Sequence, residues 1–291
     1  RVSAQLIQTI SRAEESKTAG IKNNLRDLFI PRKGFMFVAY DFSQVELRLF
    51  IDSSGCTKMA DYIKAGHDPY TATSWDLFTK KFIESLPKIE QKAFRQIAKA
   101  ISLGLLYGMG MNKLIAQISS YGLKLSERRA LEILNKYYKL FPVREYMQKV
   151  TSEIYRTGKI NLNIKSNRME IMRDFKIPQD LAYKGVNTLI QSTAGYVLKF
   201  AMLRVNKFIK DCQLSRDVRL VACIHDELLF EIRSDVLDDI LLQDIKNEIE
   251  DHETFILPLE VTVKKGESWG TMKDFSLYAD ALNLVGAVDA K

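Results

Sequence analysis

The stretch that decides the fold is residues 218–232, which read Val-Arg-Leu-Val-Ala-Cys-Ile-His-Asp-Glu-Leu-Leu-Phe-Glu-Ile. Two β-rich runs, 218–224 and 227–232, flank the polar pair His225 and Asp226. Branched and aromatic residues on either side of two polar residues are typical of a β-hairpin. The sequence therefore predicts two strands with Asp226 at the tip of the turn between them.

A second apolar run lies far upstream, at residues 34–40 (Gly-Phe-Met-Phe-Val-Ala-Tyr), and Asp41 follows it directly. This run predicts a buried strand that ends in a carboxylate. A further strand is predicted over residues 257–263, with Pro258 at its start or the whole strand on a sheet edge. If these strands are neighbours in one sheet, Asp41 and Asp226 converge at its edge.

Helical patterns dominate the rest of the chain. From about residue 69 to residue 183 the pattern is mostly helical, with Ser126 as the N-cap of a helix that stops near Phe141. The alternating segment 159–172 predicts a short hairpin. Further helices are predicted over residues 45–52, 185–210 and 236–250. Three or four strands separated by helices predict an α+β fold, an antiparallel sheet with flanking helices and a mostly helical insertion.

Composition narrows the class of protein. The 291 residues are 46% hydrophobic, which supplies a substantial core, and no run approaches the ~20 apolar residues of a membrane span. The first residues show no signal-peptide pattern. Three widely spaced cysteines predict neither a disulfide framework nor a zinc site and fit a reducing, intracellular compartment. The net charge of +7 suits a polyanionic partner.

The two aspartates suggest a metal site. Mg²⁺ prefers hard oxygen ligands, usually one or two carboxylates together with phosphates and water. Two such ions about 4 Å apart could activate a hydroxyl nucleophile and neutralise a leaving pyrophosphate. Asp41 and Asp226 would be the ligands, with the backbone carbonyl of Phe42. Each aspartate is also, taken alone, an ordinary strand end or turn residue.

A stripe of four side chains follows one predicted helix. Arg95, Lys99, Leu103 and Tyr107 are each four residues apart, so they form one slowly rotating row on its surface. The row goes from cation to cation to apolar to aromatic, the order that a triphosphate tail, a sugar and a base require. Arginine suits bidentate phosphate binding, and lysine acts as a point charge. The simpler alternative is an amphipathic helix with two solvated cations.

Three segments in this order resemble the polymerase core of family A DNA polymerases: residues 41–48 (Asp-Phe-Ser-Gln-Val-Glu-Leu-Arg), residues 95–108, and residues 224–228 (Ile-His-Asp-Glu-Leu). The resemblance implies a right-hand architecture and covers about residues 1–270. The implied parts are a palm at 1–66 and 185–270, helical fingers at 67–184, and a C-terminal tail at 271–291. A thumb and an exonuclease domain are expected on an omitted N-terminal region or on another chain.

The resemblance also implies roles for the catalytic residues. Asp41 and Asp226 would hold two Mg²⁺ ions, for which Mn²⁺ would substitute, and Glu227 would be the auxiliary carboxylate. Lys99 would hold the triphosphate with Arg95 and donate a proton to pyrophosphate.

Residues along the predicted helix and after the first strand would contact the nucleotide. Glu46 matches the steric gate that crowds a ribose 2′-hydroxyl, and Tyr107 would guard the template side. Leu103 departs from the Phe or Tyr usual in the family, and Tyr70 replaces a usual His. The remaining nucleotide contacts are Ser43, Gln44 and Arg26.

Other positions match the family's contacts to nucleic acid. Asn187 and Gln191 would read the minor groove, where they check base-pair shape. His225 would lie near the primer terminus. Arg168 would grip a strand backbone, and Arg12 and Lys184 are weaker matches for the primer and template.

Together these features predict an enzyme that adds deoxynucleotides to a primer 3′-hydroxyl on a DNA template. The implied partners are primer-template DNA and dNTPs. An RNA polymerase-like or reverse-transcribing enzyme is the alternative within nucleotidyltransferases, and use of ribonucleotides would separate them. A non-catalytic nucleic-acid-binding subunit is the alternative from another class, and it would bind DNA without Asp226 and extend no primer.

Overall fold

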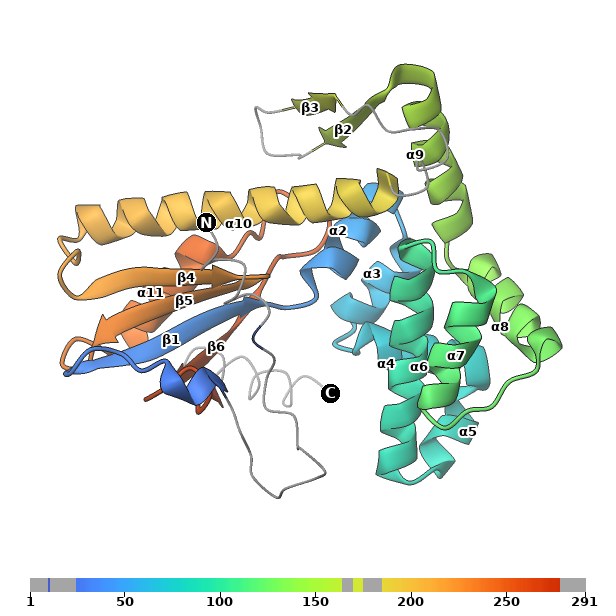
Figure 1. The fold of residues 1–291 in the computed structure, drawn as a ribbon, viewed down its shortest axis with the longest axis horizontal. Coiled ribbons are helices and arrows are strands. Elements are labelled where there is room, and N and C mark those ends of the chain that lie inside the picture. The colour runs from blue at the N-terminus through green and yellow to red at the C-terminus, as the bar shows by residue number, and fades with distance from the viewer. Residues whose placement is uncertain (1–9, 11–24, 164–169, 175–184, 278–291) are drawn as a thin grey trace. The chain divides into compact units, whose positions relative to one another are not determined.

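The structure is a computed structural model, and it describes residues 10, 25–163, 170–174 and 185–277. The chain folds into two compact units, which are treated separately here (Figure 1). Unit 1 consists of residues 1–45, 195–253 and 258–291, and unit 2 consists of residues 46–194 and 254–257.

Unit 1 is built on a five-stranded antiparallel sheet. Its strand order is β4-β5-β1-β6-β7, so β1 lies between β5 and β6, two strands that are distant from it in sequence. The strands are β1 (Phe35–Phe42), β4 (Val218–Ile224), β5 (Glu227–Arg233), β6 (Val261–Gly266) and β7 (Lys273–Phe275). The unit also contains the 3₁₀ turn η1 (Leu25–Leu28), the helix α11 (Asp239–Ile249) and residues 195–211 of the helix α10 (Gly185–Asp211).

The central position of β1 explains its continuous apolar sequence. Val38, Ala39 and Tyr40 are fully buried, because β1 is paired on both edges and covered on both faces. The Tyr40 hydroxyl donates a hydrogen bond of 3.0 Å to the carbonyl of Leu242 in α11, which fixes that helix on one face. The edge strand β4 differs: Leu220 is partly exposed, and a bulge interrupts its pairing there.

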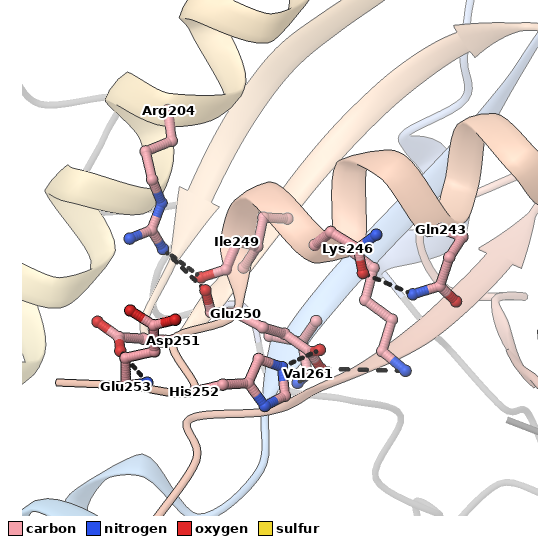
Figure 2. A network of polar contacts seen from close by, with 10 residues as sticks. Arg204, Gln243, Lys246, Ile249, Glu250, Asp251, His252, Glu253 and Val261 are labelled. Atoms are coloured by element: carbon pink, nitrogen blue, oxygen red, sulfur yellow. Dashed lines mark hydrogen bonds and ion pairs between the residues drawn. The ribbon is translucent and has the colours of Figure 1, made fainter. Parts of the chain in front are cut away.

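A polar network joins α10 to the end of α11 within unit 1 (Figure 2). The Arg204 guanidinium donates hydrogen bonds of 2.7, 2.9 and 3.1 Å to the carbonyls of Glu248, Ile249 and Glu250. These carbonyls end a helix and have no partner inside it. The buried Glu250 carboxylate accepts a 2.8 Å bond from the Val261 amide, which ties the network to the start of β6.

Unit 2 is mostly helical. The long helix α6 (Lys88–Leu106) lies at its centre, and Ile97, Ala98 and Ile101 on its inner face are almost completely buried. Gly104 lets the chain return closely over this helix, since a Cβ there would meet Met109 Sδ at 3.2 Å. The elements are α2 (Val45–Ser54), α3 (Thr57–Lys64), α4 (Pro69–Phe78), α5 (Lys80–Ser85), α6 (Lys88–Leu106), α7 (Met111–Ser120), α8 (Glu127–Leu140), α9 (Val143–Thr157) and the hairpin β2 (Lys159–Asn163) with β3 (Glu170–Asp174). None of the helices within the described ranges is long and apolar enough to cross a membrane.

The predicted fold class is confirmed, an antiparallel sheet together with a helical part. The hairpin at 218–232 forms as predicted, and Ser126 caps α8 by accepting a hydrogen bond from the Arg129 amide. The strand predicted over 257–263 is wrong at its start: β6 begins at Val261, because Pro258 has no amide hydrogen to donate to a ladder. The sequence prediction also missed the short strand β7.

The two compact units have other bounds than the predicted palm and fingers, whose boundaries stay a prediction. The first boundary between the units falls between residues 45 and 46 rather than after residue 66, so α2 and α3 belong to the helical unit. The second falls inside α10, between residues 194 and 195 rather than after residue 184. Helix α10 thus contributes to both units.

Replacing Arg204 should weaken unit 1. We expect Arg204→Met to lower the free energy of unfolding by about 2 kcal/mol, because three carbonyls at the end of α11 lose a charged donor. Urea denaturation at pH 7 measures this change. Arg219→Met, at an exposed position on β4, is the matched control and should change stability little. Equal effects of the two substitutions would contradict the importance of the network.

Candidate functional site

The predicted carboxylates of unit 1 are placed by strand register. Asp41, near the end of β1, lies directly opposite Glu227, the first residue of β5. The Phe42 amide donates a 3.1 Å hydrogen bond to the carbonyl of Asp226, so the turn residue lies beside the end of β1. Opposite residues of an antiparallel pair project to the same face of a sheet. The structure therefore places Asp41 and Glu227 on one face of the sheet, with the backbone of Asp226 beside the end of β1.

The β4–β5 turn has the backbone that a two-residue hairpin needs. His225, its first residue, has a φ of 56°. Tight hairpin turns require positive φ at this position, and a non-glycine residue there is uncommon. His225 is exposed and Asp226 is half-buried at the tip. Because the turn has only two residues, Asp226 cannot move far from the sheet edge.

Two further side chains engage these carboxylates. The Lys264 ammonium on β6 lies 2.5 Å from Asp41 Oδ2 and 3.9 Å from Glu227 Oε2. The Trp269 indole donates a buried 3.1 Å hydrogen bond to Glu227 Oε1. Glu227 is thus a buried carboxylate held from two sides, whereas the Asp41 side chain keeps 25% of its surface exposed. Asp41 is the more accessible of the two.

The donor chemistry at this edge fits a hard divalent cation. Carboxylate oxygens are the ligands that Mg²⁺ prefers, and Asp41 and Asp226 lie at adjacent positions on the same sheet edge. Within the described part of the chain, no group of three or more His, Cys, Asp or Glu side chains is gathered as a ready-made metal site. A cation bound here would therefore need ligands besides protein side chains, such as phosphate oxygens or water.

Arg26, a predicted phosphate contact, has partners within unit 1. Its guanidinium donates hydrogen bonds of 3.1 and 2.8 Å to the carbonyl of Ile10 and lies 4.0 Å from the centre of the Trp269 ring. Trp269 belongs to the apolar cluster beneath the carboxylates, which also contains Phe37, Ala39, Ile224 and Leu229. Arg26 thus packs against Trp269, which in turn holds Glu227 in the carboxylate site formed by Asp41, Asp226 and Glu227. The role of Arg26 in binding phosphate stays a prediction.

In unit 2, the two cations of the predicted stripe lie around one aromatic ring. Arg95 lies 5.6 Å and Lys99 5.7 Å from the centre of the buried Tyr70 ring. Arg95 also makes a bidentate pair with Asp68, with distances of 2.9 and 2.8 Å. Asp68 in turn caps α4 by accepting a 2.8 Å bond from the Thr71 amide. The arginine predicted to bind phosphate is therefore already oriented by a carboxylate.

The ion pair changes the proton affinity of both partners. Burial alone would raise the pKa of Asp68, but hydrogen bonds from Arg95 and Thr71 outweigh it and lower that pKa below its usual value. The hydrogen bond to Asp68 raises the pKa of Arg95. Burial, and then the charge of Asp68, raise the pKa of Tyr70. The Tyr70 hydroxyl thus stays protonated at neutral pH.

The other end of the stripe carries Tyr107, predicted to guard the template side, which contacts Glu46, the predicted steric gate. The Tyr107 hydroxyl, just after α6, donates a short hydrogen bond to the Glu46 carboxylate on α2. Burial and this bond raise the pKa of Tyr107. Leu103 is half-buried one turn earlier on the same helix. Glu46 and Tyr107, which are 61 positions apart in sequence, therefore act as one hydrogen-bonded pair.

The remaining predicted residues that the structure describes lie at the link between β1 and α2 and on α10. In unit 1, Ser43 donates its amide to the Glu260 carbonyl at 2.8 Å, and Gln44 has a φ of 54° at the link to α2. In unit 2, Gln191 is exposed on α10, and the buried Asn187 Oδ1 accepts no hydrogen bond from any residue that the structure describes. Arg12, Arg168 and Lys184 lie outside the described residues.

Three contacts of the two sites were not predicted from the sequence: Lys264 with Asp41, Trp269 with Glu227, and Asp68 with Arg95. Lys264 follows a regular alternation in residues 261–264, so it reads as a solvated strand residue. Only the pairing of β6 with β1 brings it to Asp41. Asp68 does carry a sequence signal, because an aspartate before Pro69 is a strong helix N-cap.

The family comparison and the curated relatives agree with each other, since both are DNA polymerases. The sequence profile of DNA polymerase family A matches residues 3–271. DNA polymerase I of Helicobacter pylori is 32% identical over 83% of this chain and 26% of its own length. DNA polymerase I of Caldicellulosiruptor bescii is 29% identical over 84% of this chain and 28% of its own length. The chain thus spans about a quarter of the length of these curated relatives.

A solved structure matches as well. The POL domain of Pol1 from M. smegmatis, in complex with DNA primer-template and dNTP, has a TM-score of 0.74 and 26% sequence identity. The match covers 91% of this chain and 44% of that chain.

The Asp68–Arg95 pair makes stability depend on pH. Because the Asp68 pKa is lowered on folding, the pair stabilises the protein above the unfolded pKa of about 3.9 and stops doing so as pH falls through the folded value. Asp68→Asn keeps an N-cap acceptor but removes the charge. We expect this variant to be less stable than the wild type at pH 7 and the difference to shrink below about pH 4. Urea denaturation from pH 7 to pH 3 measures it, and a constant difference would contradict the ion pair.

Proposed function

Because the chain belongs to DNA polymerase family A, we propose that it adds deoxynucleotides to a primer 3′-hydroxyl under the direction of a DNA template, with release of pyrophosphate. The observation that carries this proposal is the register of β1 against β5, which gathers Asp41 and Asp226 at one sheet edge. The match to a polymerase domain solved with primer-template and dNTP supports it. The names palm for unit 1 and fingers for unit 2 are part of the proposal.

Family A polymerases use divalent metal ions. In this chain Asp41, Asp226 and the Phe42 carbonyl would hold two Mg²⁺ ions, for which Mn²⁺ would substitute. When bound, the ions lower the proton affinity of the attacking hydroxyl and neutralise charge on the phosphates. Glu227 is proposed to position the neighbouring turn, since it is buried and fixed by Trp269 and Lys264.

The cations of α6 are proposed to bind the triphosphate. Arg95 pairs with Asp68 through Nε and Nη2, which orients the guanidinium before the nucleotide arrives and leaves its remaining N–H groups to donate to phosphate oxygens. Lys99, beside the same Tyr70 ring, supplies a point charge and the proton that leaves with pyrophosphate. Tyr70 supports both cations through its ring and presents a protonated hydroxyl.

Sugar selection is assigned to the hydrogen-bonded pair of Glu46 and Tyr107. The tyrosine hydroxyl fixes the carboxylate in one position, where it would exclude a ribose 2′-hydroxyl. Leu103, one turn earlier on α6, would contact the sugar through apolar atoms alone. Ser43 and Gln44 at the β1–α2 link, and Arg26, complete the proposed nucleotide contacts.

Contacts to primer and template are assigned to residues of α10 and of the β4–β5 turn. Gln191 is exposed on α10, so its amide can contact base-pair edges. Asn187, one turn earlier, has a buried amide oxygen, and its side chain would have to turn outward to make the same contact. His225 is exposed beside Asp226, where it would meet the primer end. Arg12, Arg168 and Lys184 are proposed as backbone contacts from the sequence resemblance.

The test is primer extension by the chain with Mg²⁺ and dNTPs. We expect extension, and a loss of about 10³-fold or more in Asp41→Asn and in Asp226→Asn, because each carboxylate charge would stabilise the transition state by several kcal/mol. Asp244→Asn, an exposed aspartate on α11 of the same unit, is the control and should keep full activity.

The same assay separates the alternatives. Equal extension with ribonucleotides would replace the DNA assignment by an RNA polymerase-like one. Binding of primer-template without extension, unchanged in Asp226→Asn, would instead indicate a non-catalytic nucleic-acid-binding subunit.

The sugar assignment has its own prediction. Glu46→Ala should raise the use of ribonucleotides relative to deoxynucleotides by roughly 10-fold or more, since it removes the group that crowds the 2′-hydroxyl. Tyr107→Phe keeps the ring but frees the carboxylate, so a smaller increase is expected. Competition between one dNTP and the matching NTP in single-nucleotide extension measures the ratio. An unchanged ratio in Glu46→Ala would remove Glu46 from sugar selection.

A further inference from the structure

Lys264 lies inside the carboxylate site and has no role in the reaction described above. Its ammonium is 2.5 Å from Asp41 Oδ2 and 3.9 Å from Glu227 Oε2, and only 15% of its side chain is exposed. It is therefore a largely buried cation against the same Asp41 oxygens that would bind a metal ion. Lysine is rarely buried in this way without a carboxylate partner.

Sheet register explains why the lysine reaches this place. Lys264 is paired with Ala39 on β1, two residues before Asp41 on the same face. Paired residues project to the same face of a sheet, so the Lys264 ammonium lies on the face that carries the carboxylates of Asp41 and Glu227. Lys264 is paired on its other side with Asp274 of β7. The position is thus set by backbone pairing on both edges of β6.

The two neighbouring carboxylates of Asp41 and Glu227 are stabilised by a nearby cation. Asp41 and Glu227 are directly opposite each other on neighbouring strands, and like charges in this arrangement repel. Lys264 offsets this repulsion within the protein itself. A divalent ion bound to Asp41 would offset the same repulsion, and its charge would repel the ammonium. The lysine and the metal ion are therefore competitors for Asp41.

We propose that Lys264 is an internal counter-ion that holds Asp41 while no metal is bound and must be displaced from it when a divalent cation binds. The inference rests on the proposed function, in which Asp41 and Asp226 hold that cation. Its consequence is a weaker intrinsic affinity for metal than the two aspartates alone would give. Binding of metal alone is then weak, and the phosphates of a nucleotide supply the additional ligands that favour displacement.

Direct measurement of Mn²⁺ binding tests the proposal without any assay of activity. Free Mn²⁺ is followed by electron paramagnetic resonance while the chain, without nucleotide, is titrated. Lys264→Met keeps the length of the apolar stem but removes the charge, so Mn²⁺ should bind roughly tenfold more tightly. Lys264→Arg retains the charge and should bind Mn²⁺ as weakly as the wild type.

Lys265→Met is the matched control. Lys265 is the next residue of β6, and its ammonium lies 3.4 Å from the centre of the Phe275 ring rather than against a carboxylate. This control should leave Mn²⁺ affinity unchanged. Thermal melting with a chelator gives a second readout, in which Lys264→Met should melt lower than the wild type and recover when Mn²⁺ is added. If Lys264→Met does not fold, Lys264→Gln replaces it in both measurements.

Asp41→Asn separates failure of this proposal from failure of the proposed function. If Asp41→Asn weakens Mn²⁺ binding but Lys264→Met leaves it unchanged, the metal site stands and the counter-ion role of Lys264 is overturned. If Asp41→Asn leaves Mn²⁺ binding unchanged, the metal site itself is overturned, and the role of Lys264 with it.

Discussion

The pairing register of β1 with β5 is the constraint on which the carboxylate site depends. It sets Asp41 opposite Glu227, and the two-residue turn then leaves Asp226 beside the end of β1. Because side chains alternate between the faces of a strand, a shift of one residue would move Asp41 to the other face. The fully buried Val38 and Tyr40 oppose such a shift, since it would exchange the environments of the two faces of β1. Apolar packing thus fixes the position of charged groups.

The charged groups proposed to bind ligands have partners within the chain. Arg95 is paired with Asp68 in unit 2, and Asp41 is paired with Lys264 in unit 1. Such pairs limit the cost of holding isolated charges away from water and fix side-chain orientation. For Asp41, the pair also means that a bound metal ion would replace an existing interaction. The net free energy of metal binding is then the energy of the new metal–carboxylate contacts minus that of the lost Lys264–Asp41 pair. This reduction favours reversible binding.

Much of this could be predicted from sequence. The runs at 34–41 and 218–232 predicted the central strand and the hairpin, because long apolar runs beside turn residues have few alternatives. Spacing alone placed Arg95, Lys99, Leu103 and Tyr107 on one helix; the structure confirms this for the first three, and Tyr107 follows as the C-cap of α6. Family resemblance then supplied roles that spacing could not.

Contacts between distant segments could not be predicted. Lys264 reaches Asp41, and Tyr107 reaches Glu46, only through pairing and packing that no local pattern encodes. The start of β6 was wrong because the apolar sequence Leu257-Pro258-Leu259 resembles a strand, whereas only an isolated bridge forms there, between Asp251 and Leu259. The three-residue β7 is too short to show a periodic pattern at all.

The most direct test of the central claim is a crystal structure with Mn²⁺ and a dNTP, in which anomalous scattering locates the metal. We expect manganese bonded to carboxylate oxygens of both Asp41 and Asp226, at about 2.1 Å, with the Lys264 ammonium withdrawn from Asp41. Manganese bound away from both aspartates, with Lys264 still paired to Asp41, would contradict the account.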